Sequence, residues 1–251
     1  MHLSNYHSHC SFCDGRSMPE EFVKFALAKS FRAYGISSHG PLPFETFWNM
    51  SAFDMPEYLV EISRLKDKYQ GHLEIYTGME IDYLDTTYIP SIPYFQNLPL
   101  DYRIGSVHFL PIATELCEAN MVCIDGPFSE FKQAVDTYFE GDIRKMVKRY
   151  YESSIQMVEL GGIDIVGHLD KIYMNGQRCK DFSFTAPWYR NMVNEYLEVI
   201  AGKGLIVEIN TKNLLKKQQT FPRQEYLSRM RELQIPVMVN SDCHTPDLVN
   251  D

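Results

Sequence analysis

Seven short apolar segments, most of them followed by a helical segment, recur along this chain and constrain its fold more than any other feature. We expect them to form strands at residues 3–7, 33–37, 72–77, 102–107, 163–166, 205–210 and 236–239. Strands that alternate with helices form a parallel sheet with right-handed crossovers. The even repetition over 251 residues favours a closed barrel over an open sheet. The prediction is therefore an α/β fold, a seven-stranded variant of the TIM-like (β/α) barrel.

Capping residues, prolines and glycines indicate where the intervening helices begin and end. We expect helices at residues 17–30, 54–71, 142–160, 186–201 and 221–233. Residues 90–99 are expected to form a loop with little regular structure. Residues 110–141 are interpreted as an elaborated loop over the barrel mouth, with a short strand at 121–124 and a helix after Pro127. A single domain spanning residues 1–251 is expected, and the sequence leaves open whether a covering helix is missing after the last strand.

Composition and charge exclude several classes of protein. No apolar run approaches the length of a transmembrane helix, and the N-terminus has no basic or hydrophobic signal region. The formal charge of −9 disfavours nonspecific binding to nucleic acid or to anionic membranes. The six cysteines show no disulfide framework, so a reduced, cytoplasmic protein is expected. Cys10-x-x-Cys13 has redox spacing but no second such pair, and we interpret it as a packed or incidental thiol pair.

Histidines and carboxylates gather where the expected strands end. His7 and His9 are two residues apart, so both side chains project from the same face of a strand, and Asp14 follows at a turn with Gly15. Six of the eight histidines occupy such positions; His2 and His72 are expected to be structural or solvent-facing. The strand-end residues are His7, His9, Asp14, His39, Glu80, His108, His168, Glu208, Asn210, Asp242 and His244. In a (β/α) barrel the active site lies at this rim.

So many imidazoles and carboxylates at one rim predict metal binding. Buried polar groups that converge would stay unpaired unless something binds them. Nitrogen and carboxylate ligands without an obvious thiolate suit zinc, manganese or iron, and not calcium. About nine donors and a bridging carboxylate are too many for one ion, which indicates two or three divalent metals.

The order of these motifs resembles the PHP (polymerase and histidinol phosphatase) superfamily, most closely its histidinol-phosphatase branch. The resemblance covers nearly the whole chain. It is carried by His7-x-His9 with Asp14-Gly15, Ser38-His39, Gly78-x-Glu80, Ser106-Val107-His108, Gly167-His168-Leu169-Asp170, Glu208-Ile209-Asn210-Thr211 and Asp242-x-His244. It implies a distorted (β/α)7 barrel that holds a three-metal cluster.

The resemblance also implies a ligand set for each metal. One metal would be held by His7, His9, Glu80 and Asp242; a second by the bridging Glu80 with His108 and His168; and a third by Asp14, His39 and His244. One position departs from the pattern: many histidinol phosphatases have a histidine directly after the position of Asp14, where this chain has Gly15. The Asp-Gly version is common elsewhere in the superfamily.

The resemblance implies hydrolysis of L-histidinol phosphate to L-histidinol and phosphate in histidine biosynthesis, with a small phosphomonoester as the partner. Asp14, His39 and His244 are the candidates for supplying the leaving-group proton. Arg16, Arg103 and Lys171 lie beside motif residues and are candidate phosphate contacts, the alternative for each being an ordinary surface or salt-bridge residue. Glu208 and Asn210 are expected to contact substrate or support the ligands. The alternatives are a PHP phosphoesterase for nucleotides or sugar phosphates and a noncatalytic metal-binding domain. Structural zinc sites are usually closed and thiolate-rich, which disfavours the latter.

Overall fold

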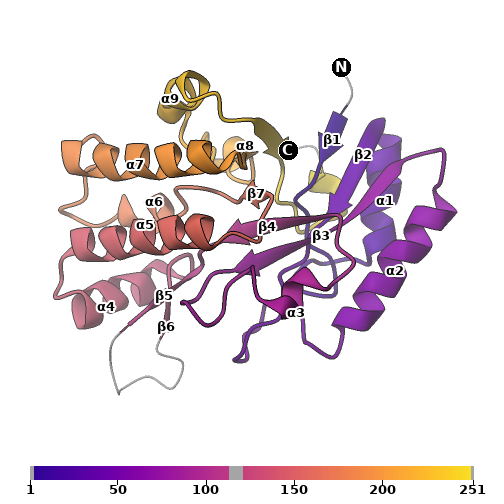
Figure 1. Ribbon diagram of the computed structural model, residues 1–251, viewed down its shortest axis with the longest axis horizontal. Coiled ribbons are helices and arrows are strands. Elements are labelled where there is room, and N and C mark those ends of the chain that lie inside the picture. The colour runs from indigo at the N-terminus through magenta and orange to yellow at the C-terminus, as the bar shows by residue number, and fades with distance from the viewer. Residues whose placement is uncertain (1–2, 113–120, 250–251) are drawn as a thin grey trace.

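The computed structural model describes residues 3–112 and 121–249, in which seven parallel strands form a nearly closed barrel (Figure 1). Their spatial order is β1 (Leu3–Asn5), β2 (Phe31–Ile36), β3 (Glu74–Asp82), β4 (Tyr102–Ser106), β7 (Ile165–Val166), β8 (Ile206–Asn210) and β9 (Val237–Asn240). Strands adjacent in this order are also consecutive along the chain, apart from the excursion between β4 and β7. The predicted distorted (β/α)7 barrel is confirmed.

Side chains complete the closure between β1 and β9. The Tyr6 N–H donates to Asn240 Oδ1 at 2.8 Å, and the Ser241 N–H donates to Asn5 Oδ1 at 2.8 Å. One backbone bond follows at the rim, from the His9 N–H to the Cys243 carbonyl at 2.9 Å. These bonds hold the first and last motifs of the chain side by side.

Helices cover the two sides of the barrel (Figure 1). They are α1 (Pro19–Ala28), α2 (Met55–Lys68), α3 (Pro93–Gln96), α4 (Phe128–Tyr138), α5 (Ile143–Leu160), α6 (Tyr173–Gly176), α7 (Pro187–Lys203), α8 (Leu214–Lys217) and α9 (Leu227–Glu232), with 3-10 turns η1 (Gln224–Tyr226) and η2 (Pro246–Leu248). Apolar residues of α1 and α2 belong to one buried cluster, and those of α4, α5 and α7 to another. Helix α5 begins where the Asp142 carboxylate accepts the Arg144 N–H, which caps its first turn.

Several boundaries differ from the sequence-based expectations. Strand β3 is longer than expected and includes Glu80, because its first half pairs with β2 and its second half with β4. The expected loop at residues 90–99 contains the short helix α3, and the short helices α6 and α8 were not anticipated. The helix expected from Phe221 begins only after η1.

The segment between β4 and α5 forms the expected elaboration. Strands β5 (Phe109–Pro111) and β6 (Met121–Cys123) pair antiparallel, and α4 follows Pro127. His72 is exposed, as expected, whereas His2 lies outside the described residues. After β9 the described chain adds only η2, and the Val237 and Val239 side chains of this strand are exposed. No helix in the described ranges has the length and apolar character needed to cross a membrane.

An aromatic floor lies beneath the rim. Tyr102 is buried across the barrel, and its hydroxyl donates to the Tyr6 carbonyl at 2.6 Å. A Cβ atom at Gly78 would lie 2.2 Å from the Tyr102 ring, so glycine is required for the ring to fit. The polar cluster above therefore has a rigid, packed base.

Candidate metal centre

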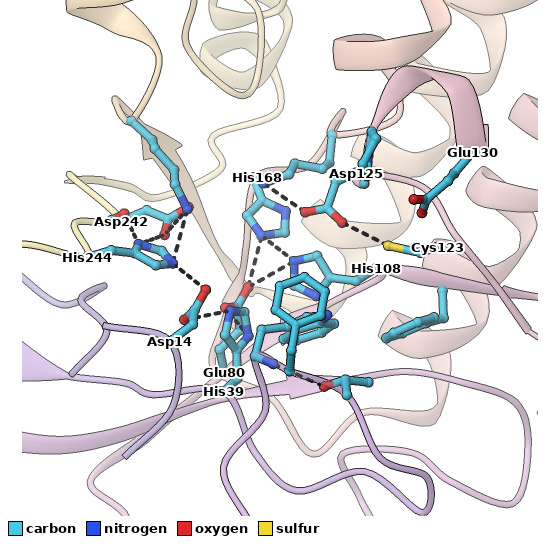
Figure 2. A pocket seen from close by; sticks show the side chains of 18 of the residues that line it. Asp14, His39, Glu80, His108, Cys123, Asp125, Glu130, His168, Asp242 and His244 are labelled. Atoms are coloured by element: carbon cyan, nitrogen blue, oxygen red, sulfur yellow. Dashed lines mark hydrogen bonds and ion pairs between the residues drawn. The ribbon is translucent and has the colours of Figure 1, made fainter. Parts of the chain in front are cut away.

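Glu80 lies at the centre of the rim and contacts histidines from several other segments (Figure 2). Its Oε2 is 3.2 Å from His7 Nε2 and 3.0 Å from His39 Nδ1. Its Oε1 is 2.9 Å from His168 Nε2 and 3.6 Å from His108 Nε2. Both carboxylate oxygens thus face imidazole nitrogens, an arrangement in which one carboxylate can bridge two cations.

The surrounding side chains form three overlapping groups whose ligand atoms lie within 4.8 Å of one another. The groups are His9, Asp14, His39 and His244; His7, His9 and Asp242; and His39, Glu80 and His108. His9 and His39 each belong to two groups, whereas the resemblance assigned each to one metal. His168 belongs to none of these groups but contacts two of their members. Its Nε2 is 2.9 Å from Glu80 Oε1 and 3.2 Å from His108 Nε2. The structure therefore brings all nine expected ligands together.

Buried atoms without hydrogen-bond partners test whether these residues fit metal ions. Nε2 of His7, Nε2 of His9, Nδ1 of His39 and Oδ1 of Asp14 are all buried and lack a hydrogen-bond partner. Leaving such atoms unpaired costs about 1–3 kcal/mol each. Imidazole nitrogen and carboxylate oxygen suit zinc and related divalent ions. The donor set fits more than one such ion.

Three side chains behind the cluster orient its members. The Glu208 carboxylate accepts the Nδ1–H of His7 at 2.6 Å, which leaves Nε2 free to bind a cation. Asp82 contacts His108 as Glu208 contacts His7, with its Oδ1 2.9 Å from His108 Nδ1. The Ser106 hydroxyl donates to Glu80 Oε1 at 2.6 Å. Such partners set the tautomer and the direction of a metal-binding imidazole.

Burial and close charges shift the pKa values of this cluster. Burial lowers the pKa of His7, yet the carboxylates of Glu208, Glu80 and Asp242 raise it well above its ordinary value. Burial alone would raise the pKa of Glu80, but the surrounding imidazoles hold it well below its usual range. Burial, followed by neighbouring imidazoles, lowers the pKa of His9. The carboxylates are therefore ionised, and a divalent cation would replace the proton that they hold on His7.

A cavity of about 400 Å3 opens over the cluster. Asp14, His39 and His244, the candidates for leaving-group protonation, all line it, and so does Lys171. Lys171 is buried, and its Nζ is 3.5 Å from Asp125 Oδ2.

The cavity wall also contains residues that the sequence analysis missed. Lys212 Nζ is 3.1 Å from Asp242 Oδ1 and 3.4 Å from His244 Nε2. Further lining residues not singled out are Glu45, Thr46, Phe47, Trp48, Phe109, Cys123, Asp125, Gly126, Pro127 and Glu130. For Lys212 the signal was available, because this residue directly follows the strand-end motif that ends at Thr211. The others lie in the loop before α2 and in the segment from β5 to the first turn of α4, where no sequence motif marks them.

Two of the three candidate phosphate contacts, Arg16 and Arg103, lie outside the cavity, whereas Glu208 and Asn210 lie behind its ligands. Arg103 stands near the start of β4, away from the cavity, and its guanidinium donates to the carbonyls of residues 95, 96 and 98 at the end of α3. Arg16 is exposed and does not line the cavity. Glu208 and Asn210 are fully buried behind the ligands, with Asn210 Nδ2 3.0 Å from Asp242 Oδ2. Their contacts are those of supporting residues.

The thiol pair lies beside the cluster. Cys10 and Cys13 are free, Cys10 Sγ is 3.1 Å from Ser38 Oγ, and Cys13 Sγ is 3.5 Å from His9 Nδ1. Burial raises the pKa of Cys10 to about 11, so this thiol stays protonated near neutral pH. Asp170, the last residue of the Gly-His-Leu-Asp motif, is buried outside the cavity lining, and burial raises its pKa to about 7.

The fold and the clustered side chains define a (β/α)-barrel protein with potential metal sites at its mouth. A family model described as the PHP domain matches residues 5–212, and the chain therefore belongs to the PHP family of metal-dependent phosphoesterases. It is similar to a probable histidinol-phosphatase of Deinococcus radiodurans, with 28% identity over 97% of this chain and 87% of the relative. It is also 28% identical to a histidinol-phosphatase of Bacillus subtilis, over 95% of this chain and 92% of the relative.

Two solved structures share the fold. A putative histidinol phosphatase from Listeria monocytogenes matches with a TM-score of 0.83 and 24% identity, over 99% of this chain and 97% of that one. The histidinol phosphate phosphatase of Lactococcus lactis, solved with zinc, L-histidinol and phosphate, matches with a TM-score of 0.72 and 22% identity. The second match covers 97% of this chain and 86% of that one.

Proposed function

We propose that this chain hydrolyses L-histidinol phosphate to L-histidinol and phosphate, as a step of histidine biosynthesis. The observation that carries the proposal is the convergence of nine imidazole and carboxylate side chains on one cavity. The proposed ligands of two or three zinc, manganese or iron ions are His7, His9, Asp14, His39, Glu80, His108, His168, Asp242 and His244. Relatives called histidinol-phosphatases, which match over 87% and 92% of their length, support the substrate assignment.

The metals and the chain's own residues have separate parts in this reaction. Bound metal ions would neutralise phosphate oxygens and lower the pKa of a water molecule that serves as the nucleophile. The ammonium groups of Lys171 and Lys212 reach the same cavity and are the proposed phosphate contacts. Both come directly after a motif residue at a strand end, and both stay close to a carboxylate that holds them in place.

The leaving alkoxide needs a proton, and three residues are placed for supplying one. Asp14, His39 and His244 line the cavity, and His244 Nε2 is 3.3 Å from Asp14 Oδ2. His39 Nε2 is 3.9 Å from the other oxygen of Asp14. We propose that one of these three residues, through an atom not bound to a metal ion, supplies the proton, because a general acid must reach the leaving oxygen.

Gly15 favours a second candidate, a PHP phosphoesterase for nucleotides or sugar phosphates. A Cβ atom at this position would lie 2.1 Å from the His9 carbonyl oxygen, so the present turn does not accommodate the histidine of the resembling branch. The Asp14-Gly15 pair beside the third proposed metal site is therefore the version that is common elsewhere in the superfamily.

Phosphate release separates the two candidates. The protein, supplemented with manganese or zinc, is assayed on L-histidinol phosphate beside nucleotide and sugar monoesters. A tenfold or greater preference for L-histidinol phosphate supports the proposal. A tenfold or greater preference for a nucleotide over L-histidinol phosphate overturns it. His168→Asn should abolish activity because it removes a proposed ligand, whereas His72→Asn, at an exposed histidine outside the cavity, should not.

A further inference from the structure

We propose that Glu130, Trp48 and Phe109 form a leaving-group subsite that selects monoesters whose leaving group is flat and positively charged. This inference rests on the proposed phosphomonoesterase function and adds the residues that determine its specificity. It concerns the part of the cavity that extends from the metal cluster to the loop before α2 and to the segment from β5 to α4.

An aromatic wall begins directly beside the metal cluster. The Trp48 ring centroid is 4.5 Å from that of His39 and 5.4 Å from that of His108. Trp48 also stacks on Phe109, with centroids 5.5 Å apart and an angle of 9° between the rings. Both aromatic residues line the cavity. A ring in the leaving group would therefore meet a flat surface just beyond the phosphate.

Negative charge dominates the cavity wall away from the ligands. Apart from the ligands and Lys212, the charged lining residues are Glu45, Asp125, Glu130 and Lys171. Lys171 and Asp125 form an ion pair, whereas Glu45 and Glu130 make none within residues 3–112 and 121–249. This part of the cavity wall therefore has three carboxylates and one ammonium group, which gives it a net charge of −2.

The charges are separated along the cavity (Figure 2). Asp242 and His244, which contact Lys212, lie at one end of the view, and Glu130 and Cys123 lie at the other. Carboxylates near a phosphate site weaken the binding of an ordinary anionic monoester by repulsion. They strengthen binding only when the leaving group carries a compensating positive charge. Carboxylates beside aromatic faces also provide the usual environment for an organic cation.

The charge part of the inference is tested with two matched esters. L-Phenylalaninol phosphate carries an ammonium group, and 3-phenylpropyl phosphate has the same ring without it. We expect wild type to prefer the cationic ester in kcat/KM and Glu130→Gln to reduce that preference at least fivefold. Glu57→Gln, at an exposed glutamate in the first turn of α2, is the control and should keep the wild-type preference. An unchanged preference in Glu130→Gln overturns the inference.

The ring part is tested with L-leucinol phosphate, which keeps the ammonium group and lacks a ring. Phe109→Leu should reduce the preference for L-phenylalaninol phosphate over L-leucinol phosphate at least threefold. Phe53→Leu, at a side chain that is 95% exposed, should not. Equal ratios in wild type and Phe109→Leu refute the ring contact.

The same panel distinguishes this inference from the proposed function. Suppose that the wild-type protein prefers L-phenylalaninol phosphate over 3-phenylpropyl phosphate, that Glu130→Gln removes this preference, and that the wild-type protein does not hydrolyse L-histidinol phosphate. These results would refute only the assignment of L-histidinol phosphate as the substrate. Suppose instead that the wild-type protein prefers L-histidinol phosphate and that Glu130→Gln keeps the wild-type preference for L-phenylalaninol phosphate over 3-phenylpropyl phosphate. These results would refute only the subsite.

Discussion

Replacing Glu208 with glutamine should weaken metal binding although Glu208 is not among the proposed ligands. The carboxylate is fully buried and accepts four hydrogen bonds. Oε1 accepts from His7 Nδ1 at 2.6 Å and from Asn240 Nδ2 at 3.0 Å. Oε2 accepts from the His168 N–H at 3.0 Å and from Asn210 Nδ2 at 3.1 Å. Glutamine keeps the shape but offers one acceptor oxygen and an NH2 group.

The size of the effect follows from which donors lose their acceptor. If the new NH2 group faces the His168 N–H, that backbone donor has no other orientation available. If it faces His7, the imidazole must move its proton to Nε2, the atom available for a cation. Leaving one buried donor unpaired costs about 1–3 kcal/mol. Loss of a partner that orients a metal ligand lowers metal affinity about 10- to 100-fold, which is roughly 1.4–2.7 kcal/mol.

Zinc competition with a chromophoric chelator measures the affinity, and urea unfolding of the metal-free protein measures the stability. Glu195→Gln, at an exposed position of α7, is the matched control and should behave as wild type. Zinc affinity equal to wild type in Glu208→Gln would refute the argument that Glu208 orients His7, even if the metal-free variant were less stable.

Three further outcomes are expected. Gly15→Ala should lower activity at least tenfold, measured as phosphate release, because its Cβ would lie 2.1 Å from the His9 carbonyl and would displace Asp14; unchanged activity would show that the turn adapts. Chelation should abolish activity and lower the thermal unfolding temperature, and both should return with added metal; a chelated protein that keeps full activity contradicts a metal-dependent reaction. Lys68 and then Arg64 lower the pKa of Glu20 to about 2 from its ordinary 4.5, so the stability from this carboxylate is present above pH 4.5 and is lost as pH falls toward 2. The difference in urea midpoint between wild type and Glu20→Gln should therefore shrink below pH 4.5, and a difference that grows there would contradict the assignment.

Arg103 and Lys212 show how neighbouring sequence positions mislead or inform. Arg103 is close in sequence to the Ser106-Val107-His108 motif, but it stands at the start of β4, and its side chain caps α3. A strand places its two ends at opposite rims of the barrel, so a short separation in sequence did not imply a shared site. Lys212 follows β8 at the rim of the cluster and contacts Asp242.

The sequence by itself determined the barrel and the rim on which the metal ligands gather. Alternating strand and helix patterns specify a parallel sheet, and the carboxyl ends of parallel strands all meet at one rim. Residues next to those ends, such as His7 and His168, therefore converge whatever the details of packing. Local pattern was sufficient for these residues because strand direction carries the long-range information.

Only the tertiary structure decided how the cluster is arranged and what surrounds it. The stagger of β3 between β2 and β4 placed Glu80 among the histidines, and the packing of β8 placed Glu208 behind His7. Trp48 and Glu130 reached the cavity through loops and a helix start whose course depends on contacts with distant segments. Their positions follow from three-dimensional packing, for which no local periodicity exists in the sequence.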